Sequence, residues 1–169
     1  MNGYLVGADV FIEAKNRHYG LDFCPAFWDW LTERNQAGRV ASVGRIADEL
    51  RKEKDELADW VDAQGSAFFQ EPDRKVMRAF RSVSNWAGNE GYEPGAIAGF
   101  LGGSDCWFLA HALAYRCTVV THEIPGAKGG RIGLLAACVG LEIDHANPYE
   151  MLRREQARFV VGPGIQYRE

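Results

Sequence analysis

The stretch Tyr4-Leu5-Val6-Gly7-Ala8-Asp9-Val10-Phe11 decides the fold, because a short apolar run is followed at once by a polar turn and a helical pattern. Tyr4-Leu5-Val6 predicts a buried strand of the parallel kind, which is covered on both faces. From Asp9 to Asn16 we expect a helix or turn that carries Val10, Phe11 and Ile12 inward. A buried strand that leads directly into a helix is typical of α/β proteins.

The rest of the chain continues this alternation. Cys117-Thr118-Val119-Val120-Thr121 is the clearest strand, being short and β-branched, and Leu141-Glu142-Ile143 is a weaker one. Ser42 and Ser104 are expected to cap helices, and Asn85–Gly95 is expected to be an exposed loop. Helices are predicted over Ala26–Arg34, Val43–Lys54, Asp55–Ala63, Pro72–Trp86, Cys106–Tyr115, Arg131–Val139 and Pro148–Phe159. The pattern predicts a three-layer α/β/α sandwich with a mainly parallel central sheet, in a single domain over residues 1–169.

Composition narrows the class of partner. The chain has 169 residues, 47% of them apolar and 12% aromatic, which is enough for a substantial core. Its formal net charge is −4, with 23 acidic against 19 basic residues. A basic surface that holds nucleic acid is therefore not indicated. Either nucleic acid is not the partner, or the contact is local and helped by bound cations.

Cysteine usage and hydropathy indicate a compartment. The four cysteines form no C-x-x-C pair, and three of them stand in apolar runs. Buried reduced thiols are expected rather than disulfides or zinc ligands. No apolar stretch approaches 18 residues, and the N-terminus lacks a basic segment followed by an apolar signal core. The sequence predicts a cytoplasmic protein without membrane contact.

Three acids stand at positions suited to a metal site. Ligands in open α/β sheets bind outside the carboxyl ends of the strands, and Glu123 stands just past such an end. Asp105 begins an apolar helix, and Glu49 lies near the apolar side of another. Divalent metals take hard oxygen ligands from separate parts of a chain. Taken alone, Asp105 is better explained as a helix N-terminal acid, worth about 0.3–1 kcal/mol, so the residues alone indicate the site only weakly.

The segment Tyr4–Asn16 also resembles the opening strand and turn of PIN domains, and more closely a PIN-like branch of poorly characterised bacterial proteins. Those chains open with an apolar triplet, then Asp, a small residue, Asp or Asn, and an apolar triplet that runs into Glu-Ala-Lys-Asn. The likeness continues through the aromatic-rich segment Phe27–Trp30, and then through the segments Val40–Leu50 and Asp105–Glu123 and the helix that contains Cys138. It therefore covers nearly the whole chain.

This resemblance implies a PIN-like fold and a metal-dependent endoribonuclease of the VapC toxin type, from a toxin–antitoxin system. Glu49, Asp105 and Glu123 match the catalytic, metal-binding acids of the family, and Thr121 matches a hydroxyl that accompanies the last acid. Mg²⁺ or Mn²⁺ is the implied cofactor, and a metal-activated water would hydrolyse the phosphodiester in line. RNA is the implied substrate, a cognate antitoxin the implied protein partner, and a homodimer a common assembly.

One departure from the family pattern matters most. The first-strand aspartate of the family should stand at position 7, which is Gly7 here. Either the chain is a deliberately inactivated toxin or it is a natural, degenerate copy, and the close match of the surrounding residues favours the first. Asp9, two residues on, could substitute in part, but residues two apart on a strand are separated by about 6–7 Å, so its expected role is that of a supporting hydrogen-bond acceptor. Metal affinity and activity are expected to be impaired.

Basic residues near the same edge are expected to contact RNA. These are Lys15, Arg17, Lys128 and Arg131. Of the four histidines, His111 lies in an apolar helix and is expected to be a core residue, and none shows metal-ligand spacing. Two rival functions remain: a non-catalytic PIN-like binding or interaction module, which Gly7 favours, and a small-ligand domain whose acids are helix caps.

Overall fold

Five parallel strands form the central sheet. The computed structural model describes residues 3–126 and 129–162. The strands follow the order β3-β2-β1-β4-β5, so β1 lies at the centre, paired with β2 on one side and β4 on the other. All four strand pairs are parallel. Their bounds are β1 Tyr4–Val6, β2 Val40–Val43, β3 Phe69–Gln70, β4 Thr118–Val120 and β5 His145–Ala146.

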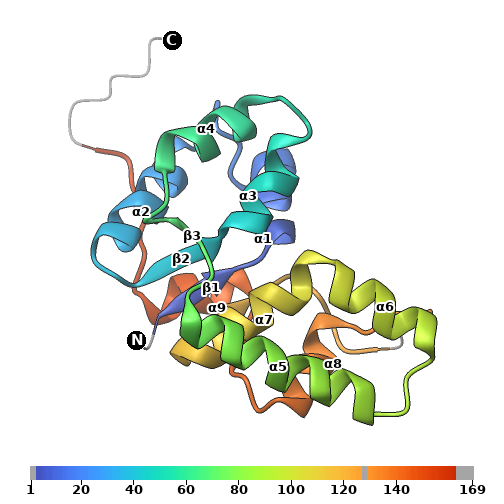
Figure 1. Ribbon diagram of the computed structural model, residues 1–169. Coiled ribbons are helices and arrows are strands. Elements are labelled where there is room, and N and C mark those ends of the chain that lie inside the picture. The colour runs from blue at the N-terminus through green and yellow to red at the C-terminus, as the bar shows by residue number, and fades with distance from the viewer. Residues whose placement is uncertain (1–2, 127–128, 163–169) are drawn as a thin grey trace.

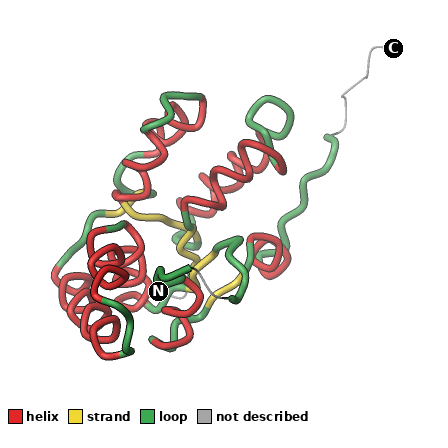
Figure 2. Tube along the Cα trace, turned by 90° about the vertical axis from the view of Figure 1, so that its right-hand side faces the viewer, coloured by secondary structure: helices red, strands yellow, loops and turns green. Residues whose placement is uncertain are grey.

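Helices cover both faces of this sheet. In Figure 1, α2, α3 and α4 lie above the strands and α5, α6, α7 and α8 below them, and Figure 2 shows the strands between helices from a second direction. The predicted α/β architecture with a mainly parallel central sheet is confirmed. The helices are α1 Ala8–Glu13, α2 Pro25–Gln36, α3 Gly44–Arg51, α4 Glu56–Gln64, α5 Arg74–Asn89, α6 Pro94–Gly102, α7 Ser104–Tyr115, α8 Leu134–Gly140 and α9 Pro148–Arg154, and a π-helical turn, η1, spans Ala14–His18.

The first strand and the helix after it anchor the core. Leu5 and Val6 are 1% and 0% exposed, which fits a central strand covered on both faces. Phe11, on α1, is fully buried and packs its ring against Trp28, Trp60 and Phe68, at centroid distances of 6.5, 5.9 and 6.1 Å. This aromatic cluster fixes α1 against the sheet, and thereby the turn between β1 and α1.

The structure corrects several local predictions. Ser42 caps no helix: it lies in β2, fully buried, and its hydroxyl donates to the carbonyl of Val6 at 2.7 Å. Ser104 is the first residue of α7 rather than its cap. Ile12 is 42% exposed, whereas Val10 and Phe11 are buried as predicted. The expected loop Asn85–Gly95 is largely helical at its ends, and the strand expected at Leu141–Ile143 lies at His145–Ala146.

The four cysteines agree with a further expectation. All four cysteines are free thiols, and three are buried. Burial raises the pKa of Cys106 to about 11 and that of Cys138 to about 12, so both stay protonated at neutral pH. Over the described ranges, no single helix has both the length and the hydropathy to cross a membrane; only α6 and α7 taken together do, and they meet at a 70° bend.

Candidate metal-binding site at the sheet edge

The topology gathers the ends of three strands at one edge. β1 pairs in parallel with both β2 and β4, so the segments after Val6, Val43 and Val120 emerge together. They lead into α1, α3 and Thr121-His122-Glu123, and the N-terminus of α7 faces them. A pocket of about 220 Å³ lies there, and it opens beside a second of about 490 Å³. The first is lined by Gly7, Ala8, Asp9, Ile46, Glu49, Ser104, Asp105, Phe108, Thr121, Glu123 and Leu134.

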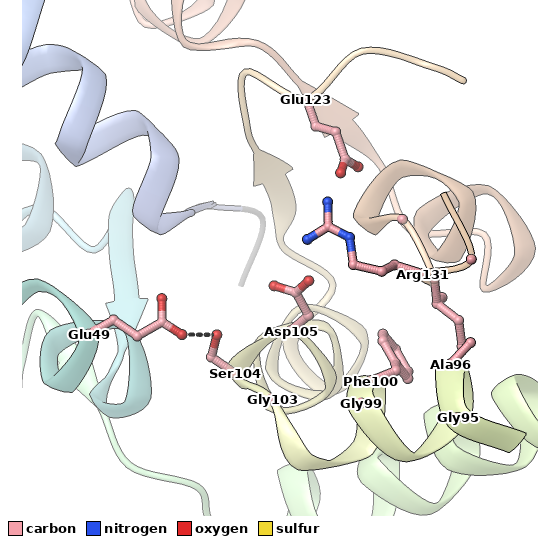
Figure 3. Close-up of a pocket in the computed structure, with 13 residues that line it drawn as sticks. Glu49, Gly95, Ala96, Gly99, Phe100, Gly103, Ser104, Asp105, Glu123 and Arg131 are labelled. Atoms are coloured by element: carbon pink, nitrogen blue, oxygen red, sulfur yellow. Dashed lines mark hydrogen bonds between the residues drawn. The ribbon is translucent and has the colours of Figure 1, made fainter. Parts of the chain in front are cut away.

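The three acids predicted from the sequence surround this space. Glu49 on α3, Asp105 on α7 and Glu123 after β4 line both pockets, and Figure 3 shows their carboxylates on different walls. Burial raises the pKa of Asp105 to about 6, with further contributions from the negative charges of Glu49, Glu123 and Asp9. Three other carboxylates therefore lie close enough to Asp105 for their charges to oppose its ionisation.

Local hydrogen bonds hold two of these acids. The hydroxyl of Ser104 donates to Oε1 of Glu49, the contact drawn in Figure 3. Oε2 of Glu123 accepts from the backbone N–H of Leu135, at the start of α8, at 2.8 Å. The backbone N–H of Glu123 donates to Oγ1 of Thr121 at 3.0 Å, so Thr121 shapes the turn that presents the acid. The contact from Ser104 was not anticipated, because its sequence position is also that of an ordinary helix cap.

Asp9 is closer to the centre of the site than the sequence indicated. Its Oδ2 accepts from the hydroxyl of Thr121 and from the backbone N–H of His122, both at 2.7 Å. The expected separation from position 7 assumed a continuing strand, which is wrong, because β1 ends at Val6 and Asp9 lies in the first turn of α1. Gly7 and Asp9 both line the pocket, and Oδ1 of Asp9 would lie 2.9 Å from a Cβ at position 7.

The predicted basic contacts divide into two groups. Arg131 lines the larger pocket, and Figure 3 shows its guanidinium between Asp105 and Glu123. Its positive charge offsets part of the rise in the pKa of Asp105. Lys15 is tied to Asp55 at 2.5 Å, away from the pocket. The side chain of Arg17 is 74% exposed and lies 3.5 Å from Glu13. Lys128 lies outside the described residues.

The donor set fits a hard divalent cation, although the acids are not closed around one. Carboxylate oxygens from separate elements are the ligands that Mg²⁺ and Mn²⁺ prefer. In the part of the chain that the structure describes, no group of three Asp, Glu, His or Cys side chains is arranged to hold an ion. Oε1 of Glu49 accepts from Ser104 and Oε2 of Glu123 accepts from the N–H of Leu135. Closing both long side chains around one ion requires them to rotate about their side-chain torsions.

Histidines near the edge form a cluster that spacing could not reveal. The rings of His18 and His122 are 5.5 Å apart, and Nε2 of His18 lies 3.1 Å from the hydroxyl of Tyr149. More than a hundred residues separate His18 from both partners, so only the fold brings them together. His111 is 3% exposed and contacts Gln70 at 2.9 Å, as expected of a core histidine, and burial lowers its pKa.

Comparison with known proteins places the chain in a family. No curated protein matches it. A chain in the crystal structure of VapBC2 from Rickettsia felis bound to a DNA fragment from their promoter has the same fold, with a TM-score of 0.52 and 15% identity over 85% of this chain and 97% of that one. The model of a domain of unknown function, DUF4411, matches residues 4–159. The protein therefore belongs to the DUF4411 family.

Proposed function

We propose that this protein is a PIN-like, metal-dependent endoribonuclease of the toxin–antitoxin type. One observation carries the proposal: Glu49, Asp105 and Glu123, far apart in the sequence, line one pocket at the carboxyl edge of a parallel sheet, where burial and the charges of the neighbouring acids raise the pKa of Asp105 to about 6. Clustered carboxylates with perturbed pKa values are typical of functional sites, because repulsion between them opposes folding unless a cation is bound. The fold shared with a chain of the VapBC2 complex supports the same class.

The acids of this chain would hold Mg²⁺ or Mn²⁺ and position the scissile phosphate. Glu49, Asp105 and Glu123 are the proposed ligands, and Ser104 orients Glu49 through its hydroxyl. When bound, the metal lowers the pKa of a water and neutralises charge on the phosphate. Thr121 keeps Glu123 at the pocket by accepting its backbone N–H. Arg131, exposed beside Asp105, attracts the phosphodiester into an otherwise acidic site.

RNA contacts must be local, because the net charge of −4 gives no extended basic surface. Arg131 and Arg17 are exposed and available to phosphate oxygens, and we include Lys128 in this role. Lys15 is the weakest candidate of those predicted, since its ammonium group is committed to Asp55. An RNA substrate implies action in the cytoplasm.

A cognate antitoxin is the proposed protein partner. The structural neighbour was crystallised as VapBC2 with promoter DNA, which supports a partner of that kind for this chain. We place its contact over the pocket of Glu49, Asp105 and Glu123, where a basic side chain would meet the clustered carboxylates. A homodimer in the free toxin is a further part of the proposal.

Cleavage of single-stranded RNA tests this function. Chelator-treated protein is incubated with a fluorescent RNA, with and without Mn²⁺, beside Asp105→Asn and the control Asp29→Asn, which removes an exposed acid of α2. We expect weak, Mn²⁺-dependent cleavage by the unmodified chain and by Asp29→Asn, and none by Asp105→Asn. Metal-independent cleavage, or cleavage that survives Asp105→Asn, would contradict the proposal.

A non-catalytic PIN-like module is the second candidate. Gly7 and the guanidinium of Arg131 between two of the acids favour it. It predicts that RNA or an antitoxin binds with the same affinity in chelator as in Mn²⁺, and that no cleavage follows even for Gly7→Asp. Growth arrest when Gly7→Asp is expressed would exclude it.

A further inference from the structure

Glycine at position 7 is not required by the backbone. Gly7 is the N-cap of α1 with φ −78° and ψ 161°, an extended conformation that any residue adopts. A Cβ there would lie 3.2 Å from the carbonyl oxygen of Val120, which must yield by a few tenths of an ångström, and 3.9 Å from Phe108. The closest atom to that Cβ would be Oδ1 of Asp9, at 2.9 Å. The carboxylate of Asp9 thus fills the space that a side chain at position 7 would enter.

Hydrogen bonds hold this carboxylate in place and leave it able to bind a cation. Oδ2 of Asp9 accepts from Thr121 and His122, and Oδ1 accepts from the backbone N–H of Val10 at 3.0 Å. A carboxylate offers about four acceptor positions. Among the described residues these three bonds are the ones Asp9 makes, so one position remains, on the oxygen that lies over Gly7.

The same carboxylate faces the other acids. Asp9 lines the pocket of about 220 Å³ together with Glu49, Asp105 and Glu123. Its anchors, Thr121 and the N–H of His122, belong to the segment that presents Glu123. Asp9 is therefore fixed relative to Glu123 by direct contacts, as a preorganised ligand must be.

We propose that Asp9 is itself a metal-binding carboxylate in this chain, in place of a side chain at position 7. The inference rests on the proposed metal-dependent function and departs from the merely supporting role expected from the sequence. Gly7 then has a physical purpose: without a Cβ, it leaves room for the carboxylate of Asp9 to lie across the end of β1. The site keeps four carboxylates, with the first moved two residues along the chain.

Calorimetric titration of Mn²⁺ into the full, chelator-treated chain tests this assignment. The proteins compared are the unmodified chain, Asp9→Asn, Gly7→Ala, Gly7→Asp, the exchange Gly7→Asp/Asp9→Asn, and the control Asp29→Asn. Asn keeps an acceptor oxygen for Thr121 and His122 and removes the charge, while its NH2 group replaces the oxygen that accepts from the N–H of Val10. Thermal melting in chelator checks that each variant is folded.

We expect Asp9→Asn to weaken Mn²⁺ binding at least about 10- to 100-fold, the loss typical of residues that only support metal ligands. Gly7→Ala should also weaken binding, although it removes no acid, because its Cβ displaces Oδ1 of Asp9. The exchange variant should regain most of the lost affinity, and Asp29→Asn should bind like the unmodified chain.

The outcomes separate the two proposals. Asp9 is not a ligand if Asp9→Asn and Gly7→Ala bind Mn²⁺ as tightly as the unmodified chain does. The same conclusion follows if the unmodified chain fails to bind Mn²⁺ while Gly7→Asp binds it and cleaves RNA. In both cases the metal-dependent function stands. If all of these folded proteins, the exchange variant included, neither bind Mn²⁺ nor cleave RNA, the proposed function itself fails.

Discussion

Replacing Asp105 by Asn should make the metal-free protein more stable at neutral pH. Burial, together with the negative charges of Glu49, Glu123 and Asp9, raises the pKa of Asp105 from 3.8 to about 6. A shift of roughly two units corresponds to about 3 kcal/mol of destabilisation when the carboxylate is ionised. Although protein atoms surround its carboxyl group, Asp105 remains solvent-accessible in an open pocket, so solvent screening reduces the expected gain to about 1–2 kcal/mol. For a chain of this size that is a rise of about 4 °C in Tm.

The pH dependence of this gain has a definite sign. In the folded protein Asp105 binds its proton more tightly than in the unfolded chain, so its penalty is complete above about pH 6 and disappears as the pH falls below 3.8. Asn carries no charge at any pH. The difference in unfolding free energy between the two proteins should therefore be largest at pH 7.5 and close to zero near pH 4.

Urea unfolding in chelator at pH 7.5, 6, 5 and 4 measures this difference, with Asp29→Asn as the charge-matched control. Added Mn²⁺ should raise the Tm of the unmodified chain and not that of Asp105→Asn, because a bound cation relieves the same repulsion. An Asp105→Asn protein that is less stable at pH 7.5, or a gain that does not change with pH, would refute the reasoning.

Four further substitutions test the fold and the RNA contacts. Ser42→Ala should cost about 1–3 kcal/mol in urea unfolding, because a buried hydroxyl of β2 no longer donates to the central strand; an unchanged midpoint would contradict that role. Phe11→Ala should cost about 3–5 kcal/mol by the same measurement, since it empties the centre of the aromatic cluster; a loss under about 1 kcal/mol would show that the cluster is not the anchor of α1. Lys15→Met, which breaks the ion pair with Asp55, should cost at most about 1 kcal/mol of stability and leave RNA affinity unchanged in a filter-binding assay. Arg131→Ala should weaken RNA binding in the same assay. Equal effects of the two substitutions on RNA binding would contradict the different roles given to Lys15 and Arg131.

Strong local patterns predicted the centre of the fold. Tyr4-Leu5-Val6 and the β-branched run of β4 are apolar on both faces, so their burial at the centre of the sheet could be predicted. β2 was missed because Ser42 suggests a helix cap, and only a tertiary contact, its bond to the carbonyl of Val6, makes a serine suitable for the core. α6 was missed because Pro94 and three glycines read as a loop, while its position depends on packing against α5 and α7.

For the site, topology explains what could be foreseen. Parallel strands bring their carboxyl ends to one edge, so acids at those ends were expected to meet, and Glu49, Asp105 and Glu123 line the same pocket. Distances of a few ångströms could not be foreseen. The reach of Asp9 depends on β1 ending at Val6, and the contact between Ser104 and Glu49 joins residues 55 positions apart. Their roles in binding metal remain proposals of this account.

The most direct test of the central claim is anomalous X-ray diffraction from a crystal of the chain grown with Mn²⁺. We predict a manganese peak in the pocket between Asp105 and Glu123, with Glu49 and Asp9 turned toward it and the guanidinium of Arg131 displaced from between the two acids. A crystal at saturating Mn²⁺ that shows no peak there, with the carboxylates still on separate walls of the pocket, would contradict it.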